Sequence, residues 1–113
     1  MIVERDRKTL SEIYLALLHN DYTLEVTTDA GEMMPRMERF RPDLLLVGYD
    51  LPGYEVNEVC TSVKNAFEIP VILLSDPLSV QTLCMQSVKA DGVLEKPINT
   101  DILLNQLEAL LLV

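Results

Sequence analysis

The sequence is poor in the residue types that several functional classes require. Only 9 of its 113 residues are Lys or Arg, against 18 Asp or Glu, and the formal net charge is −9. A protein that binds a nucleic-acid backbone needs clustered cations, so we expect no nucleic-acid partner for this chain. The apolar runs, such as 44–47 and 71–74, are far shorter than the roughly 20 residues of a membrane span. We therefore expect no membrane segment.

Cysteine and histidine are also scarce. The two cysteines, Cys60 and Cys84, are far apart in the sequence and match no metal-binding or redox spacing. We expect both to be small buried hydrophobic residues in a reducing cytoplasm. The single histidine, His19, follows the first predicted helix, where a lone histidine is usually explained by the helix dipole. These residues predict neither a metal site nor a catalytic site.

What the sequence does contain is a regular alternation of helical stripes and short apolar runs. Apolar residues at helical spacing predict five helices, at 10–18, 32–40, 56–67, 80–88 and 99–111. Short apolar or alternating runs between them predict five strands, at 2–3, 23–27, 44–47, 71–74 and 93–94.

Several single residues place the helix ends. Pro35 is tolerated only in a first helical turn, so the second helix is expected to start near Glu32. Asp6 or Thr9 can cap the first helix. The last helix has three candidate caps, at residues 99–101.

Strands that alternate with helices imply a parallel sheet covered on both faces. The runs 44–47 and 71–74 are apolar on both faces, as buried parallel strands are. We predict an α/β fold with a single five-stranded parallel sheet flanked by five helices, doubly wound, as one domain over residues 1–113. In such a sheet the functional groups gather at the carboxyl ends of the strands.

Three segments give this pattern a family likeness. RPDLLLV followed by LPG at 41–53, IPVILLS at 69–75 and ADGVLEKP at 90–97 occur in this order. In order and spacing they resemble the receiver domain of two-component response regulators, and the resemblance covers nearly the whole chain. It implies the (βα)5 receiver fold, which flavodoxin-like proteins share, and a role in phosphorelay signal transduction.

The resemblance also implies a phosphorylation pocket, and here the sequence departs from the family. Receivers carry a phosphoacceptor aspartate at the end of the third strand, and two acids after the first strand hold Mg²⁺ with it. The acceptor position of this sequence is Gly48, and the acidic pair falls on Glu4 and Arg5. The aromatic switch position is Val93. No carboxylate stands at the acceptor position, and one acid is replaced by a base.

Other positions of that pocket are retained. The hydroxyl after the fourth strand is Ser75, and the lysine and proline after the fifth are Lys96 and Pro97. Asp50 lies two residues beyond the acceptor position. There Asp is common as a turn residue before proline.

We interpret the chain as a degenerate receiver, or pseudo-receiver, that undergoes no phosphotransfer. Arg5 and Lys96 are then expected to neutralise Glu4 and Asp50 without a metal, since a cation on Arg5 about 4 Å from Glu4 gains roughly 4 kcal/mol at an effective dielectric of 20, before desolvation. We expect no enzymatic activity, no metal and no cofactor. The domain would act by protein–protein contact or as a homodimer, through the fourth helix, fifth strand and fifth helix, about residues 79–111.

Three other interpretations of the chain compete with the pseudo-receiver. The chain could be a working but atypical receiver that is phosphorylated on Asp50. It could also be the receiver piece of a longer response regulator or hybrid kinase, which is compatible with either reading. A flavin-binding protein of flavodoxin type needs a Ser/Thr/Gly-rich phosphate loop after the first strand. Residues 4–8 are charged and contain no glycine, so we reject flavin binding.

Overall fold

The fold alternates strands with helices along the chain, and the computed structural model describes residues 1–76 and 90–111. The strands are β1 (Ile2–Val3), β2 (Val26–Thr27), β3 (Leu45–Gly48), β4 (Val71–Ser75) and β5 (Gly92–Glu95). The helices are α1 (Arg7–Leu18), α2 (Met33–Phe40), α3 (Val56–Phe67) and α5 (Thr100–Leu111), with a 3₁₀ turn at Ala30–Glu32 before α2.

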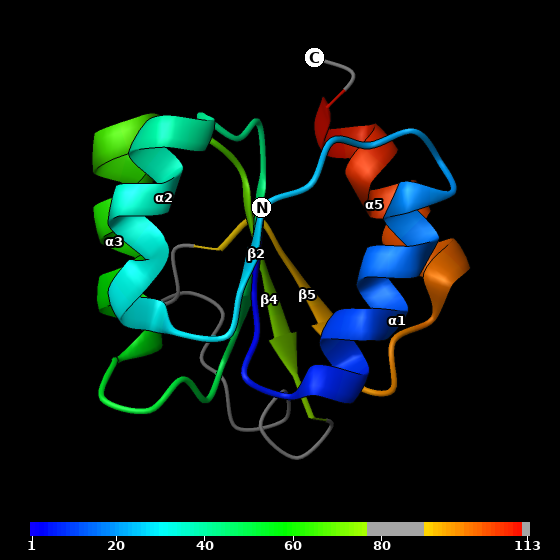
Figure 1. Cartoon of the computed structure of the whole chain (residues 1–113), viewed down its shortest axis with the longest axis horizontal. Coiled ribbons are helices and arrows are strands. Elements are labelled where there is room, and N and C mark those ends of the chain that lie inside the picture. The colour runs from blue at the N-terminus through cyan, green and yellow to red at the C-terminus, as the bar shows by residue number, and fades with distance from the viewer. Residues whose placement is uncertain (77–89, 112–113) are drawn as a thin grey trace.

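All five strands are parallel, in the order β2-β1-β3-β4-β5. Figure 1 shows α2 and α3 on one face of the sheet and α1 and α5 on the other. The predicted five-stranded, doubly wound parallel sheet is confirmed. Of the five predicted helices, four are present among the described residues. The predicted helix at 80–88, with Cys84, lies outside them.

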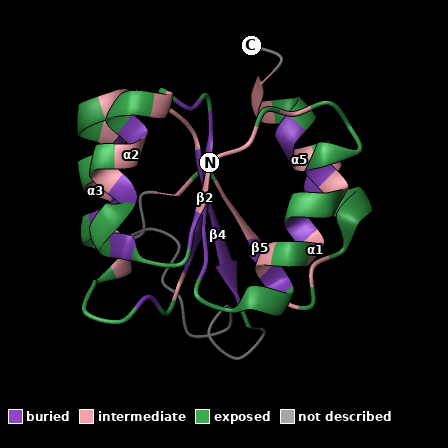
Figure 2. Cartoon of the chain, viewed as in Figure 1, coloured by how far each residue is buried: buried purple, intermediate pink, exposed green. Residues whose placement is uncertain are grey.

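The core consists of two apolar layers, one on each face of the sheet. Successive strand residues point to opposite faces. In β3 and just before it, Leu44 and Leu46 therefore join the layer under α1 and α5, while Leu45 and Val47 join the layer under α2 and α3. Figure 2 shows the buried residues on the inward side of each helix. No helix in the described ranges is long and apolar enough to cross a membrane.

Local signals set the helix ends. The Asp6 side chain caps α1 by accepting a hydrogen bond from the Thr9 amide, and Asn99 Oδ1 accepts the Asp101 amide at the start of α5. Pro35 is the third residue of α2, within the first turn as predicted. The second strand was predicted too long: it starts only at Val26. The strand stays this short because the neighbouring β1 has only two residues to pair with it.

The reactivity of the Cys60 thiol reports on the packing of the core layer under α3. Its side chain is fully buried, and burial raises the pKa of its thiol to about 11. Because only the thiolate reacts, we expect Cys60 to react with a disulfide reagent at pH 8 about 100-fold more slowly in the folded protein than in urea. The assay uses a Cys84→Ser variant so that one thiol is counted. Equal rates in the two conditions would show that Cys60 is accessible.

Candidate functional site

Four of the sequence-predicted residues meet at the carboxyl edge of the sheet. Glu4 directly follows β1, Gly48 and Ser75 end β3 and β4, and Lys96 follows β5. The parallel register brings these ends together, and the Lys96 amide donates to the Ser75 carbonyl over 2.8 Å. The edge therefore forms one cluster of charged and polar groups.

The carboxylate of Glu4 is the centre of this cluster. Its side chain is 0% exposed. Lys96 Nζ lies 3.0 Å from Glu4 Oε1, and the Asp6 amide donates to the same oxygen over 3.1 Å. Glu4 Oε2 is buried without a hydrogen-bond partner among the described residues. A charge so deeply buried depends on its partner, because an uncompensated buried carboxylate is costly.

Gly48 makes room for that carboxylate. A Cβ atom built on Gly48 would lie 2.9 Å from Glu4 Oε2 and 3.2 Å from Glu4 Cδ. Among the glycines, only Gly53 has a positive φ. The absence of a side chain at Gly48 therefore matters for space and not for backbone conformation. A Cβ atom there would approach the Glu4 carboxylate more closely than an ordinary van der Waals contact, so the carboxylate would have to shift.

Arg5 and Asp50 form a second, exposed ion pair. Arg5 Nε lies 3.8 Å from Asp50 Oδ2, and the two side chains are 55% and 54% exposed. Ion pairs of this kind contribute about 0–1 kcal/mol. Lys96 is thus paired with Glu4 and Arg5 with Asp50. The expectation that Arg5 neutralises Glu4 was wrong, because Lys96 occupies that place.

The remaining predicted residues, Ser75, Val93 and Pro97, lie at the same edge or in the core, and none of them forms a hydrogen bond or ion pair with the central carboxylate in the described part of the chain. The Ser75 side chain is 2% exposed, and its hydroxyl donates to the Asp76 carbonyl over 3.3 Å. Val93 is half-buried in β5 and packs against the core layer under α2 and α3. Pro97 follows Lys96 through a cis peptide bond.

Asp6, which follows β1 and was predicted as a helix cap, is also part of the site. Its backbone amide holds Glu4, while its side chain accepts the Thr9 hydroxyl over 2.6 Å. That hydrogen bond lowers the pKa of the Asp6 carboxyl. The signal in the sequence is an Asp, a preferred N-cap residue, between the end of the first strand and the start of the first helix.

The residues present do not fit Mg²⁺. This ion prefers near-octahedral oxygen coordination with one or two carboxylates. Gly48 offers no ligand, Glu4 Oε1 is held by Lys96, and Arg5 brings a cation to the same edge. No group of three or more His, Cys, Asp or Glu within residues 1–76 and 90–111 could hold a metal ion.

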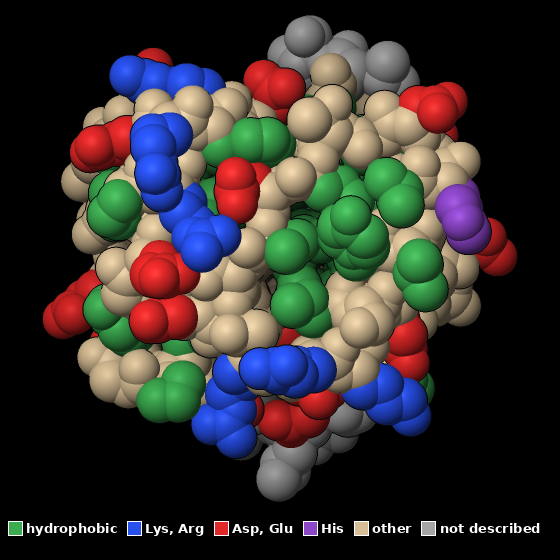
Figure 3. All heavy atoms as spheres, viewed as in Figure 1, with side chains coloured by type: hydrophobic (Ala, Val, Ile, Leu, Met, Phe, Trp, Pro, Cys, Tyr) green, Lys and Arg blue, Asp and Glu red, His purple; other side chains and the backbone are tan. Residues whose placement is uncertain are grey.

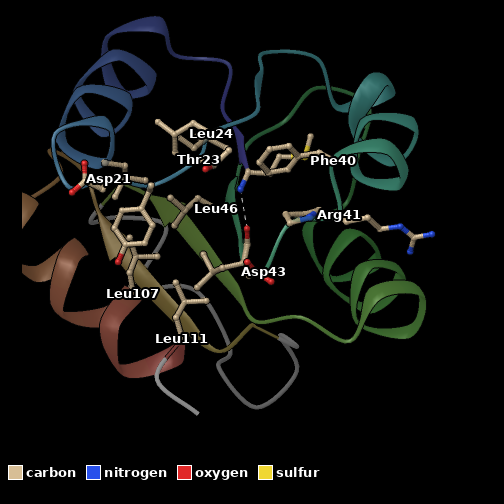
Figure 4. Close-up of a pocket in the computed structure, with 15 residues that line it drawn as sticks. Asp21, Thr23, Leu24, Phe40, Arg41, Asp43, Leu46, Leu107 and Leu111 are labelled. Carbon is tan, nitrogen blue, oxygen red and sulfur yellow. Dashed lines mark hydrogen bonds between the residues drawn. The ribbon is translucent and has the colours of Figure 1, made fainter.

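A pocket of about 320 Å³, lined by apolar and polar atoms in similar share, lies at the opposite, amino edge of the sheet. Leu24, Leu46 and Leu107 form part of its wall (Figure 4), and it opens as a hydrophobic hollow between the two helical layers (Figure 3). The Met1 amine donates to the Leu44 carbonyl over 2.9 Å beside it. Burial lowers the pKa of this amine to about 6. The pocket shares no residue with the charged cluster.

The role of Gly48 can be measured by adding a single methyl group. Gly48→Ala is expected to destabilise the fold by about 1–3 kcal/mol, because the methyl group displaces the Glu4 carboxylate from Lys96. In a Glu4→Ala background the same change should cost less than about 1 kcal/mol. Urea denaturation of the four proteins gives both costs. Equal costs would show that Gly48 does not make room for Glu4.

The buried ion pair can be tested by comparing a single variant with a double variant. Lys96→Met leaves the Glu4 carboxylate buried without its cation, so we expect a loss of about 3–5 kcal/mol. The double variant Glu4→Gln with Lys96→Met removes both charges and should lose less than Lys96→Met alone. Thermal and urea unfolding report these differences. A double variant less stable than Lys96→Met would contradict the pairing.

Comparison with known proteins supplies the family. The family model of the response regulator receiver domain matches residues 1–108. Response regulator protein GraR of Staphylococcus aureus is 26% identical over 113 residues, which cover 97% of this chain and 50% of that protein. The chain thus spans about half the length of this curated relative.

Solved structures resemble the whole chain. A putative response regulator from Chloroflexus aurantiacus has a TM-score of 0.87 at 20% identity, over 99% of this chain and 95% of that one. The receiver domain of the sensor histidine kinase PA1611 from Pseudomonas aeruginosa, which holds a magnesium ion in its active-site cleft, has a TM-score of 0.82 at 20% identity, over 96% and 93%. These likenesses show the fold, and the family match over residues 1–108 shows that the chain belongs to the response regulator receiver domain family.

Proposed function

We propose that this receiver domain signals without accepting a phosphoryl group, as a pseudo-receiver that acts by protein contact. One observation supports this proposal above the others. The carboxylate at the strand edge belongs to Glu4, is 0% exposed, and lies 2.9 Å from where a Cβ atom at position 48 would stand. The lysine of the pocket is paired with it at 3.0 Å.

Phosphoryl transfer to a carboxylate places two demands on a site. The attacking oxygen must be reachable by the donor, and cations must neutralise the charge on the transferred group. Glu4 is closed to solvent, and Lys96 is already engaged with it. Arg5 is drawn toward Asp50. Glu4 and Asp50 therefore each have a cation of this chain nearby, which lowers the electrostatic demand for a metal or a phosphoryl group, although Glu4 Oε2 has no hydrogen-bond partner among the described residues.

The module proposed is a non-enzymatic one, in the cytoplasm, within a two-component-type signalling protein. Its partner surface would include the β5–α5 side, the described part of the surface predicted at 79–111. Ile102 supplies an apolar contact there, since its side chain is 50% exposed. The net charge of −9 favours a protein partner over nucleic acid.

A second candidate function is phosphorylation on Asp50. It is favoured by the position of Asp50 just beyond β3 and by the 54% exposure of its side chain. Against it, Arg5 Nε lies 3.8 Å away, and Lys96 is paired with Glu4 instead. Either function fits a domain within a longer regulator, since the chain spans about half of its relative GraR.

Phosphorylation is tested with a small-molecule donor. The domain is incubated with acetyl phosphate and Mg²⁺, and intact-protein mass spectrometry follows any added phosphoryl group. We expect no adduct on the natural sequence or on the control Asp50→Asn. A variant that places acids at two positions, Gly48→Asp and Arg5→Asp, and shortens the acid at the third, Glu4→Asp, serves as the positive comparison and should gain an adduct, provided circular dichroism shows it folded.

The two candidate functions predict different results in that assay. An adduct on the natural sequence that disappears in Asp50→Asn would overturn the pseudo-receiver proposal and establish Asp50 as the acceptor. An adduct that persists in Asp50→Asn would also overturn it, and peptide mapping would then locate the modified residue.

A further inference from the structure

The outward face of α1 carries a cluster of exposed apolar side chains. Tyr14, Leu15 and Leu18 are 37%, 52% and 47% exposed. With Tyr54 and Ile102 they are the five exposed large hydrophobic residues of the described ranges. Single exposed apolar residues are ordinary on a protein surface, but a contiguous group marks an interaction site. Three of these five lie within five consecutive residues of one helix.

The shape of this face is a ridge with a shallow groove on each side. One groove, of about 360 Å³, runs toward β2 and is lined by Leu10, Tyr14 and Val26. The other, of about 480 Å³, runs toward α5 and is lined by Ile98 and Leu104 among others. Leu15 lines both grooves, so it forms the ridge between them. A surface that offers both a knob and adjacent grooves can pack against a copy of itself.

Charge along α1 fits the same arrangement. The helix begins with the exposed cations Arg7 and Lys8, and the exposed acid Asp21 follows its other end. Two chains of net charge −9 repel each other over most of their surfaces. Antiparallel placement of two α1 helices brings the cations of each chain opposite the acid of the other, twice by symmetry. α1 itself, with Arg7, Lys8 and Glu12, has a formal charge of +1.

We propose that a second copy of this chain docks on the outward face of α1, with the two α1 helices antiparallel about a two-fold axis. The Leu15 side chain of each copy sits in a groove of the other. This inference is independent of the proposed loss of phosphorylation. It assigns self-association to α1 and not to the β5–α5 side. The face involves one helix and its flanks, so the dimer is a small and reversible one.

The test is the oligomeric state over a concentration series, measured by sedimentation equilibrium on the 113-residue chain. The natural sequence is expected to pass from monomer to dimer as its concentration rises. Leu15→Glu should weaken the dimer at least about tenfold, because it places a charge at the centre of the interface. Tyr54→Glu is the matched control, because Tyr54 is 48% exposed and lies before α3, and it should leave the dimer unchanged. Ile102→Glu, on α5, tests the β5–α5 side in the same assay. Circular dichroism shows that each variant is folded.

Three results would overturn the inference. They are a natural sequence that stays monomeric at every concentration, a dimer unaffected by Leu15→Glu, or a dimer lost in Ile102→Glu alone, which would place the contact on α5. A charge exchange provides an independent readout. Lys8→Glu should weaken the dimer, and the double variant Lys8→Glu with Asp21→Lys should recover part of it. Absence of any recovery would contradict the antiparallel arrangement.

Discussion

The ion pair between Glu4 and Lys96 joins groups 92 residues apart in the chain and holds the carboxyl edge of the sheet together. It links the end of β1 to the end of β5 across the two strands between them. Gly48 leaves space beside the pair, since a Cβ atom there would lie 2.9 Å from Glu4 Oε2. The buried carboxylate and the missing side chain on the neighbouring strand are thus parts of one structural feature.

This feature accounts for how the site balances its charges. In a receiver with acids at the strand ends, repulsion between carboxylates is relieved by a divalent cation. Here the repulsion is absent, because Gly48 replaces one acid and Arg5 another, and the remaining carboxylate of Glu4 has its own cation in Lys96. The pocket keeps the fold's geometry while its electrostatics no longer favour a metal. That combination is what the proposed pseudo-receiver function depends on.

Much of the fold was predictable, because buried parallel strands and apolar helical stripes are local patterns. The bounds of α3 follow from its stripe, whereas the extent of β2 (Val26–Thr27) depends on how little of β1 can pair with it. In the site, the spacing placed the charged residues at one edge. It left open whether Lys96 meets Glu4 or Asp50, and it gave no hint that the Glu4 carboxylate crowds Gly48. Those contacts depend on how groups at the ends of β1, β3 and β5 meet in space, and these strands lie far apart in the sequence.

The Glu4–Lys96 pair is proposed to close the pocket to a metal and to a phosphoryl group. The most direct measurement is an amide NMR titration of the labelled domain, first with Mg²⁺ and then with beryllofluoride, a mimic of the phosphoryl group. The account predicts no saturable shifts at Gly48, Ser75 or Lys96 at sub-millimolar metal or after beryllofluoride. Saturable shifts at these residues would contradict it, since they would show that the pocket still takes both ligands.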